Sequence, residues 1–123
     1  MAVLSIHHVS LLVKNTEKAL DFYIRILGLE LDGSRPELGY PGAWVNIGGQ
    51  QIHLLELPNP DPVEGRPAHG GRDRHMAVVV DDIAAIEMRL EQSNIMYTRS
   101  RSGRKAVFCR DYDGNALELI EMQ

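Results

Sequence analysis

Four residues whose side chains can bind a divalent metal occupy matched places in the two halves of the chain. His8 precedes the apolar run VSLLV, and His75 precedes MAVVV, 67 residues later. His53 lies in IHLLE and Glu118 lies in LELIE, and these two segments are 65 residues apart. Imidazole nitrogens and carboxylate oxygens are suitable ligands for divalent first-row metals. The repeat therefore predicts a metal site that takes two ligands from each half.

The pattern of apolar residues predicts the same order of elements in both halves, a strand, a helix and three strands. In the first half, strands are expected over residues 6–13, 29–32, 43–47 and 51–57, with a helix that Asn15 or Thr16 caps and Gly28 ends. In the second half, strands are expected over 75–80, 96–99, 106–110 and 116–120, with a helix that Asp82 caps. The expected fold class is α+β, with two βαβββ modules.

The division of the chain follows from a break in the apolar pattern. Residues 58–74 hold four prolines and three glycines and show no apolar periodicity, so we interpret them as a connector. Module 1 then covers about 4–57 and module 2 about 75–123. A length of 123 residues suits a single domain, 1–123, that contains both modules.

Strand geometry separates the candidate ligands from the apolar core. Side chains alternate along a strand, and the face with Val9 and Val13 is expected to pack on the helix, so His8 faces the other way. Glu56 competes with His53 for the second ligand position. Because Glu56 lies three residues from His53, it points to the opposite face of the strand. Glu56 also matches Glu121 in the repeat, and His53 is therefore favoured.

Composition excludes several partner classes. A net charge of −4 and a pI of about 5.7 give no general attraction for nucleic acid or an anionic membrane. No apolar stretch approaches the roughly 20 residues that span a bilayer. A single cysteine, Cys109, excludes an intramolecular disulfide, and the first ten residues do not form a signal peptide. We therefore expect a cytoplasmic protein.

Five segments carry a resemblance to a known family: HVSLLV, ALDFYIRILGLEL, IHLLE, HMAVVVDD and RDYDGNALELIE. Together they resemble the vicinal oxygen chelate superfamily, which includes glyoxalase I, methylmalonyl-CoA epimerase, extradiol dioxygenases, fosfomycin-resistance enzymes and bleomycin-binding proteins. The runs Ala19–Leu31 and Asp111–Leu119 are the most specific parts. The resemblance implies a pseudo-twofold pair of modules whose curved mixed sheets surround one divalent metal, Zn, Ni, Fe, Mn or Co. Its ligand positions fall on His8, His53, His75 and Glu118.

The resemblance also implies a reaction class. Members of the superfamily bind a pair of substrate oxygens to the metal, which polarises a carbonyl or stabilises an anion. We expect a glyoxalase-like lyase or isomerase that acts on a small oxygenated metabolite, with Glu118 as ligand and catalytic base. Glutathione adducts are not expected as substrates, because the positions at which bacterial glyoxalase I contacts glutathione hold Leu12 and Leu57 here.

Two alternatives remain open at this stage. One is a binding or sequestration protein without turnover, of the bleomycin-resistance type. The other is an extradiol-type dioxygenase, in which His53 would be an additional fourth ligand. A homodimer is expected, and the sequence leaves open whether the site forms within one chain or across two.

Candidate substrate contacts come from the same strands and from a basic loop. Ser10 and Asn46 lie on strands that carry ligands or pair with them, and Arg99 and Arg101 belong to a basic cluster that continues with Arg104 and Lys105. The cluster is interpreted either as a solvated loop or as a clamp for a carboxylate or phosphate of the substrate.

Overall fold

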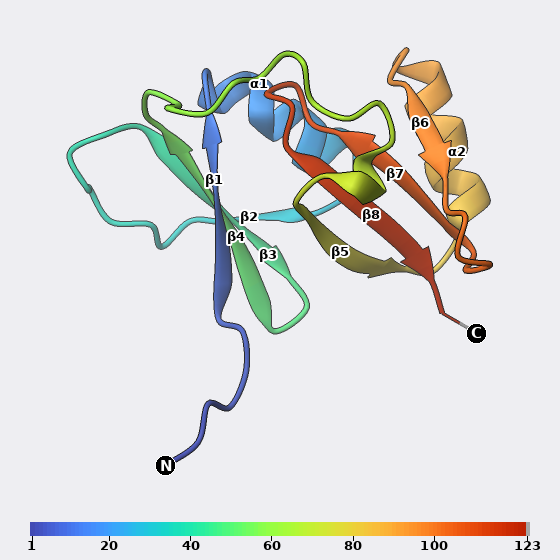
Figure 1. The fold of residues 1–123 in the computed structure, drawn as a ribbon. Coiled ribbons are helices and arrows are strands. Elements are labelled where there is room, and N and C mark those ends of the chain that lie inside the picture. Colours follow the sequence, from blue (N-terminus) through green and yellow to red (C-terminus); the bar gives the residue numbers. More distant parts are fainter. Residues whose placement is uncertain (123) are drawn as a thin grey trace. The chain divides into compact units, whose positions relative to one another are not determined.

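Each half of the chain folds into its own four-stranded mixed sheet (Figure 1). The computed structural model describes residues 1–122. The chain divides into two compact units between Pro60 and Asp61, inside the expected connector, and each unit is considered by itself below. The expected α+β fold with two βαβββ modules is confirmed.

The first unit contains the elements β1 (His8–Val13), α1 (Thr16–Leu20), η1 (Asp21–Ile26), β2 (Glu30–Asp32), β3 (Gly42–Ile47) and β4 (Gln50–Glu56). Its strand order is β1-β4-β3-β2. β1 runs parallel to β4, and the other neighbours are antiparallel. The chain from β1 to β4 thus makes the crossover that a parallel pair requires, with the helix inside it.

The second unit repeats this plan with the elements η2 (Gly70–Arg72), β5 (His75–Val80), α2 (Ile83–Gln92), β6 (Tyr97–Arg99), β7 (Ala106–Arg110) and β8 (Ala116–Glu121). Its strand order is β5-β8-β7-β6, with β5 parallel to β8. α2, the longest helix described, has 10 residues. No helix within residues 1–122 is long and apolar enough to cross a membrane.

The predicted helix signals have the expected roles. The side chain of Asn15 accepts a hydrogen bond from the backbone N–H of Lys18 at 3.0 Å, and Asp82 does the same for Ala85 at 3.1 Å. Each supplies an acceptor to a first-turn N–H that has no partner within the helix. Gly28 takes the left-handed conformation, with a φ of 75°, just after the first helical segment ends.

The first helix differs from the single α-helix that its apolar spacing predicts. After α1 it widens into a π-helix, η1, and the N–H of Leu27 donates to the carbonyl of Phe22 five residues earlier at 3.1 Å. The wider turn places Phe22 in the core with Tyr23 and Ile26, and each of these side chains is at most 1% exposed. Packing of these large side chains therefore overrides the regular helical period.

In the first unit, the two faces of the sheet have different characters. Val45, Ile52 and Leu54, each at most 1% exposed, form the core face on which α1 packs. Alternation along the strands leaves His8 and His53 on the opposite face. The sequence prediction of which strand face meets the helix is confirmed for this unit.

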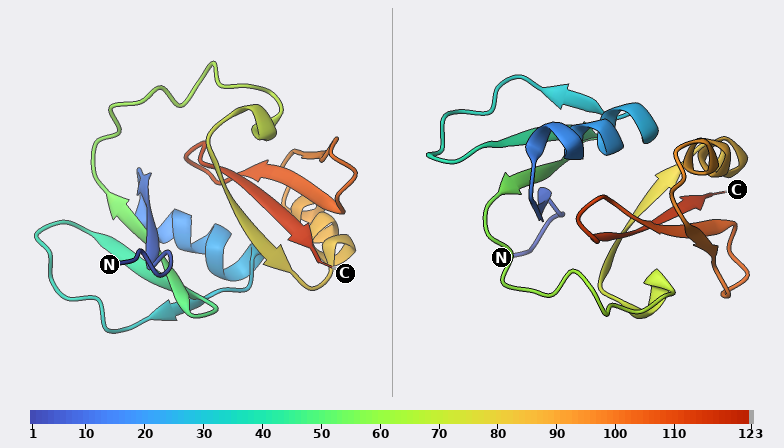
Figure 2. Two further views of the ribbon diagram at one scale, coloured as in Figure 1. Left: turned by 60° about the horizontal axis from the view of Figure 1, so that its bottom comes forward. Right: turned by 90° about the horizontal axis from the view of Figure 1, so that it is seen from above.

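The second unit has the same division. Val107, Leu117 and Leu119 are at most 2% exposed, and so is Leu90 of α2. The helix α2 lies against β7 and β8 (Figure 2). Glu118 lies between two of these residues in β8, so its side chain leaves the opposite face, yet it is only 4% exposed. A carboxylate at this depth needs polar or cationic partners.

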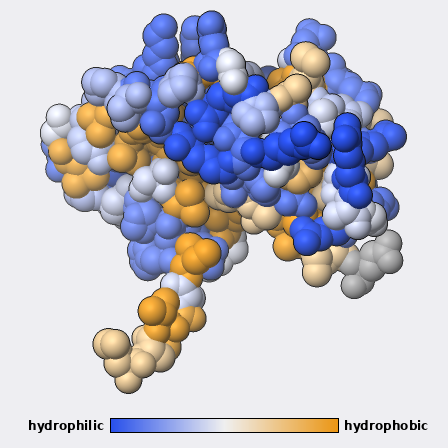
Figure 3. All heavy atoms as spheres, viewed as in Figure 1, coloured by the Kyte–Doolittle hydropathy of each residue, from blue (hydrophilic) through white to orange (hydrophobic). Residues whose placement is uncertain are grey.

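Residues 1–6 form an apolar arm that precedes β1. Met1, Val3, Leu4 and Ile6 in this segment are all exposed, with Leu4 at 91%. Figure 3 shows the apolar arm as a run of hydrophobic side chains at the amino-terminal end. Exposed apolar residues in a continuous run mark candidate contact surfaces.

Candidate metal centre

His8 and His53 lie together on the open face of the first sheet. The parallel register of β1 and β4 pairs His8 with Gln51 and Ser10 with His53, so both imidazoles leave the same face. Their rings are stacked, with centroids 3.9 Å apart and an angle of 16° between planes. The first unit therefore brings two of the four predicted ligands side by side.

His75 and Glu118 hold the equivalent places in the second unit. β5 and β8 pair His75 with Ala116 and Ala77 with Glu118, which is the register of the first unit repeated. Nε2 of His75 lies 3.3 Å from Oε1 of Glu118. Each unit thus presents one candidate ligand from its first strand and one from its last, as the 67- and 65-residue offsets predict.

The second pair presents two electron-rich atoms to one another. Nδ1 of His75 lies 2.8 Å from the carbonyl oxygen of Asp73, which can only accept, so Nδ1 carries the hydrogen. With this hydrogen on Nδ1, Nε2 is the nitrogen that faces the carboxylate of Glu118. A proton or a metal ion between Nε2 and Oε1 would satisfy both atoms. The donor set therefore fits a divalent metal.

Neither unit holds a complete metal site by itself. Within residues 1–122, neither unit gathers three or more His, Cys, Asp and Glu side chains that could bind a metal ion. Two ligands are fewer than the three or four that protein zinc sites use.

An aromatic residue accompanies each pair of candidate ligands. Trp44 stands opposite His53 in the β3–β4 register and stacks on its imidazole, with centroids 4.5 Å apart. Phe108 stands opposite Glu118 in the β7–β8 register, and its ring meets His75 edge to face at 5.1 Å. Neither Trp44 nor Phe108 is among the site residues that the sequence predicts. The predicted hairpin pairing is the signal that could have found both.

Gln51 fixes the tautomer of His53. The amide nitrogen of Gln51 donates to Asn46 at 3.0 Å and to Asp32, so its oxygen accepts from Nε2 of His53 at 2.9 Å. This arrangement leaves the lone pair of His53 on Nδ1. Burial, and then the nearby His8, lower the pKa of His53, which favours the neutral imidazole that metals bind.

Glu56, the alternative to His53, is engaged at a helix terminus. Its Oε1 accepts hydrogen bonds from the N–H of Thr16 at 2.8 Å and from the hydroxyl of Thr16 at 3.1 Å. Glu121 accepts in the same way from the N–H of Ile83 at 3.0 Å. A carboxylate is favourable at the positive end of a helix. This shared role supports His53 over Glu56 as the candidate ligand.

The basic loop sends its side chains in different directions. Arg99 donates to Glu87 of α2 at 3.0 Å, and Arg101 is exposed. Arg104, which the sequence reasoning placed in the cluster but not among the substrate contacts, lies 3.5 Å from Oε2 of Glu118. In the second unit, Arg104 is thus the member of the cluster that the structure places beside a candidate ligand.

The two other predicted substrate contacts both belong to the first unit. Ser10 is exposed and stands opposite His53 on the ligand face. Asn46 is half-buried and accepts the hydrogen bond from Gln51 described above. Ser10 therefore has access to a ligand bound at this face, whereas Asn46 acts on His53 through Gln51.

Solved structures share this fold over the whole chain. A glyoxalase family protein of Bacillus anthracis superposes with a TM-score of 0.80 at 24% identity and covers 100% of this chain and 98% of its own. TnmS3, an antibiotic binding protein of Streptomyces sp. CB03234, gives 0.76 at 23% identity, covering 100% and 99%. A FosX variant of Listeria monocytogenes, solved with Mn(II) and a dihydroxypropylphosphonic acid, gives 0.77 at 18% identity, covering 99% and 95%.

Curated relatives are similar along nearly all of the chain. Glyoxylase I 4 of Arabidopsis thaliana is 31% identical over 121 residues, which cover 94% of this chain and 69% of the relative. The mitochondrial methylmalonyl-CoA epimerase of Homo sapiens is 33% identical over 131 residues, which cover 96% and 72%. The two relatives carry the names of different reactions, so the similarity does not choose between them.

A family model settles the membership that these similarities indicate. The model of the Glyoxalase/Bleomycin resistance protein/Dioxygenase superfamily matches residues 5–119, which include both pairs of candidate ligands. The fold agrees with the solved structures over the whole chain. The resemblance found in the sequence is confirmed, and the chain belongs to the Glyoxalase/Bleomycin resistance protein/Dioxygenase superfamily.

Proposed function

We propose that this protein is a divalent-metal-dependent lyase or isomerase that moves a proton next to a carbonyl group of a small oxygenated metabolite. The observation that carries the proposal is the equivalence of the two ligand pairs, His8 with His53 and His75 with Glu118, in matching strand registers. The names of the relatives, a glyoxalase and an epimerase, support this class of reaction.

The proposed ligands are His8, His53, His75 and Glu118, from one chain or from the two chains of a dimer. Three neutral imidazoles and one carboxylate with a divalent ion carry a net charge of +1, which suits an anionic substrate. The ion is Zn, Ni, Fe, Mn or Co, all of which accept nitrogen and oxygen ligands. When bound, it would polarise the substrate carbonyl through two chelating oxygens.

Glu118 is the proposed base. The residue is buried, with 4% of its surface exposed. Nε2 of His75 lies 3.3 Å from Oε1, and Arg104 lies 3.5 Å from Oε2. We assign to an oxygen of Glu118 the proton that leaves the substrate carbon. Arg104, Arg101 and Ser10 are the proposed residues for orienting the substrate. Asn46 is a weaker candidate because it is bonded to Gln51, and Arg99 is weaker because it pairs with Glu87.

Hydrogen exchange at carbon tests this proposal without knowledge of the natural substrate. The metal-loaded protein is incubated in D₂O with a panel of small 2-oxo and 2-hydroxy carbonyl compounds, and proton NMR follows the C–H signal beside the carbonyl. We expect metal-dependent loss of that signal for at least one compound, and a loss of rate of about 100-fold or more in Glu118→Gln. Full metal occupancy without exchange in any compound would contradict the proposal.

The second candidate function is binding without turnover. In the first unit, His8, His53 and Trp44 form one continuous stack of rings on the open face of the sheet. Such a stack could hold a flat ligand against its aromatic surface. Metal analysis of protein purified without chelator separates the candidates, because about one metal per chain favours the enzyme. Protein that stays metal-free with added Ni²⁺, Zn²⁺, Mn²⁺ or Fe²⁺ favours binding alone.

We further propose a cytoplasmic homodimer. The exposed apolar arm, residues 1–6, supports a contact with a second copy, because a run of exposed apolar side chains is unfavourable in water. The single cysteine, which is buried, suits a reducing compartment. Cell fractionation tests the location, and sedimentation velocity tests the dimer.

A further inference from the structure

A hydrogen bond to the backbone two residues earlier orients His75. The backbone carbonyl of Asp73 accepts the hydrogen bond from Nδ1 of His75 at 2.8 Å. Because the neutral imidazole has one hydrogen, this bond selects the tautomer whose lone pair is on Nε2. Nε2 is the atom that lies 3.3 Å from Glu118. The position of the Asp73 carbonyl therefore decides which nitrogen of His75 is available to a metal.

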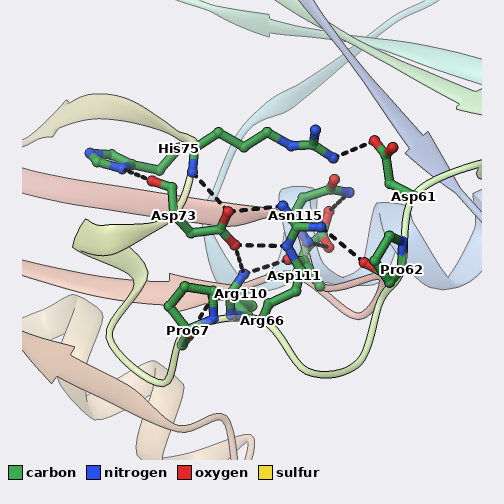
Figure 4. A network of polar contacts seen from close by, with 11 residues as sticks. Asp61, Pro62, Arg66, Pro67, Asp73, His75, Arg110, Asp111 and Asn115 are labelled. Atoms are coloured by element: carbon green, nitrogen blue, oxygen red, sulfur yellow. Dashed lines mark hydrogen bonds and ion pairs between the residues drawn. The ribbon is translucent and has the colours of Figure 1, made fainter.

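The side chain of Asp73 fixes the backbone that carries this carbonyl (Figure 4). Arg66 donates to both carboxylate oxygens, from Nε at 2.8 Å and from Nη2 at 2.8 Å, and Nη1 of Arg110 donates to Oδ2 at 2.8 Å. The N–H of Arg74 donates to Oδ1 at 2.8 Å. The side chain of Asp73 is 8% exposed, and Arg66 and Arg110 are its cationic partners.

The two arginines connect Asp73 to the rest of the second unit. Arg110, at the end of β7, donates to the carbonyls of Gly114 at 2.8 Å and Pro67 at 2.7 Å. Arg66 donates to the carbonyl of Pro62 at 2.9 Å. Together they attach the segment before β5 to the turn between β7 and β8. Glu118 lies in β8. Bidentate arginine–carboxylate pairs hold a fixed geometry.

The turn before Asp73 packs closely against Phe108. A Cβ atom added to Gly71 would lie 3.2 Å from Cζ of Phe108, and one added to Gly70 would lie 3.3 Å from Cβ of Phe108. The ring of Phe108 in turn meets His75 edge to face at 5.1 Å. The segment from Gly70 to His75 is therefore packed as well as hydrogen-bonded.

The first unit has no equivalent of this arrangement. The residue 67 positions before Asp73 is Ile6, an apolar side chain that is 63% exposed. Nδ1 of His8 lies 2.9 Å from Nδ1 of His7, an exposed neighbour. The two candidate ligand pairs are therefore equivalent, but the residues that support them differ. The carbonyl of Asp73 orients His75, whereas Nδ1 of His8 faces the exposed ring of His7.

We propose that Asp73, clamped by Arg66 and Arg110, is a positioning residue that holds His75 in the Nδ1–H tautomer and makes Nε2 the metal-binding atom. This rests on the proposed function, because it takes His75 as a ligand. Partners behind a metal-binding histidine typically change metal affinity by about 10- to 100-fold. The arrangement preorganises His75 through a backbone acceptor, as the side chain of Gln51 does for His53.

The tautomer of His75 can be measured in metal-free protein. Long-range ¹H–¹⁵N spectra of ¹⁵N-histidine-labelled protein are recorded at a pH where His75 is neutral, and His75→Ala identifies its signals. We expect Nδ1 of the wild type to show the shift of a protonated nitrogen and Nε2 that of an unprotonated one. Asp73→Asn should shift the population toward the other tautomer. A folded Asp73→Asn protein with unchanged His75 shifts would overturn the proposal.

Control variants separate positioning from folding. Asp61→Asn removes an ion pair with Arg74 in the same connector and should leave the His75 shifts unchanged. If Asp73→Asn does not fold, Arg66→Gln removes one of the two arginines and should move the shifts in the same direction. Unchanged shifts in a folded Arg66→Gln protein would then count against the clamp.

Metal titration separates this inference from the proposed function. Asp73→Asn should weaken metal binding by about 10- to 100-fold, and it should have no further effect when His75 is already alanine. If the tautomer shifts but the wild type binds no metal, the proposed function fails and the orientation of His75 stands. If the wild type binds metal and the tautomer is unchanged in Asp73→Asn, the positioning role alone fails.

Discussion

Nε2 of His75 lies 3.3 Å from Oε1 of Glu118, although 43 residues separate the two positions in the chain. The pairing of β5 with β8 creates this relationship, and the pairing of β1 with β4 repeats it for His8 and His53. Each unit therefore presents two candidate ligands on one sheet face.

Removing one ligand from each pair should abolish metal retention. The double variant His8→Ala with Glu118→Ala leaves only two of the four ligands, and we expect metal content to fall from about one per chain to less than about 0.1. Elemental analysis after gel filtration without chelator gives the ratio. The matched control, His69→Ala with Glu56→Ala, removes the same residue types elsewhere and should keep its metal. Equal metal content in both double variants would exclude the predicted ligand set.

Glu56 and His53 should have separable roles. Glu56→Ala removes the acceptor for the N–H of Thr16, and we expect a loss of about 1 kcal/mol in the free energy of unfolding with unchanged metal content. His53→Ala should lose metal binding. Urea denaturation and elemental analysis measure the two effects. Metal loss in Glu56→Ala, with retention in His53→Ala, would reverse the assignment.

Cys109 should be inert in the folded protein. Its side chain is 3% exposed, and burial, followed by the nearby Asp111, raises the pKa of the thiol to about 12. At pH 8 its thiolate fraction is about 1,000-fold lower than that of an ordinary cysteine, so native alkylation should be slower than alkylation in urea by at least that factor. Mass spectrometry follows both rates. Comparable rates would show that the thiol is accessible.

The same shift predicts a pH dependence of stability. The pKa of Cys109 is higher in the folded state than in the unfolded state, so the folded protein binds more protons at alkaline pH. The stabilisation is complete below the unfolded pKa near 9 and is lost as the pH rises toward 12. Denaturation midpoints of the wild type should fall more steeply across this range than those of Cys109→Ala. Parallel curves would contradict the assigned pKa.

The apolar arm should contribute to self-association. We expect Leu4→Glu with Ile6→Glu to shift the protein from dimer to monomer, because each charge would have to lose its hydration in an apolar contact. Sedimentation velocity at micromolar concentration measures the state. Lys14→Glu, a surface change outside the arm, serves as the control. A wild type that is monomeric, or a dimer that persists in the double variant, would exclude this role for the arm.

The sequence alone predicted the order of the elements and the members of each candidate ligand pair. Strand alternation and a repeat of fixed offset are local properties, so they show that His8 matches His75 and that His53 matches Glu118. Short-range hydrogen bonds fix the helix starts at Asn15 and Asp82, and these are equally visible in the sequence. The fold class followed from the same local signals.

Only the tertiary structure decided which distant side chains lie beside the candidate ligands and behind them. It places Arg104 beside Glu118, and Arg110 on Asp73, 37 residues away. These contacts depend on strand register and on where a loop meets a sheet, and the residue types alone do not encode either. The widened turn at Phe22 has the same origin, because the packing of large side chains overrode the helical period that the sequence displays.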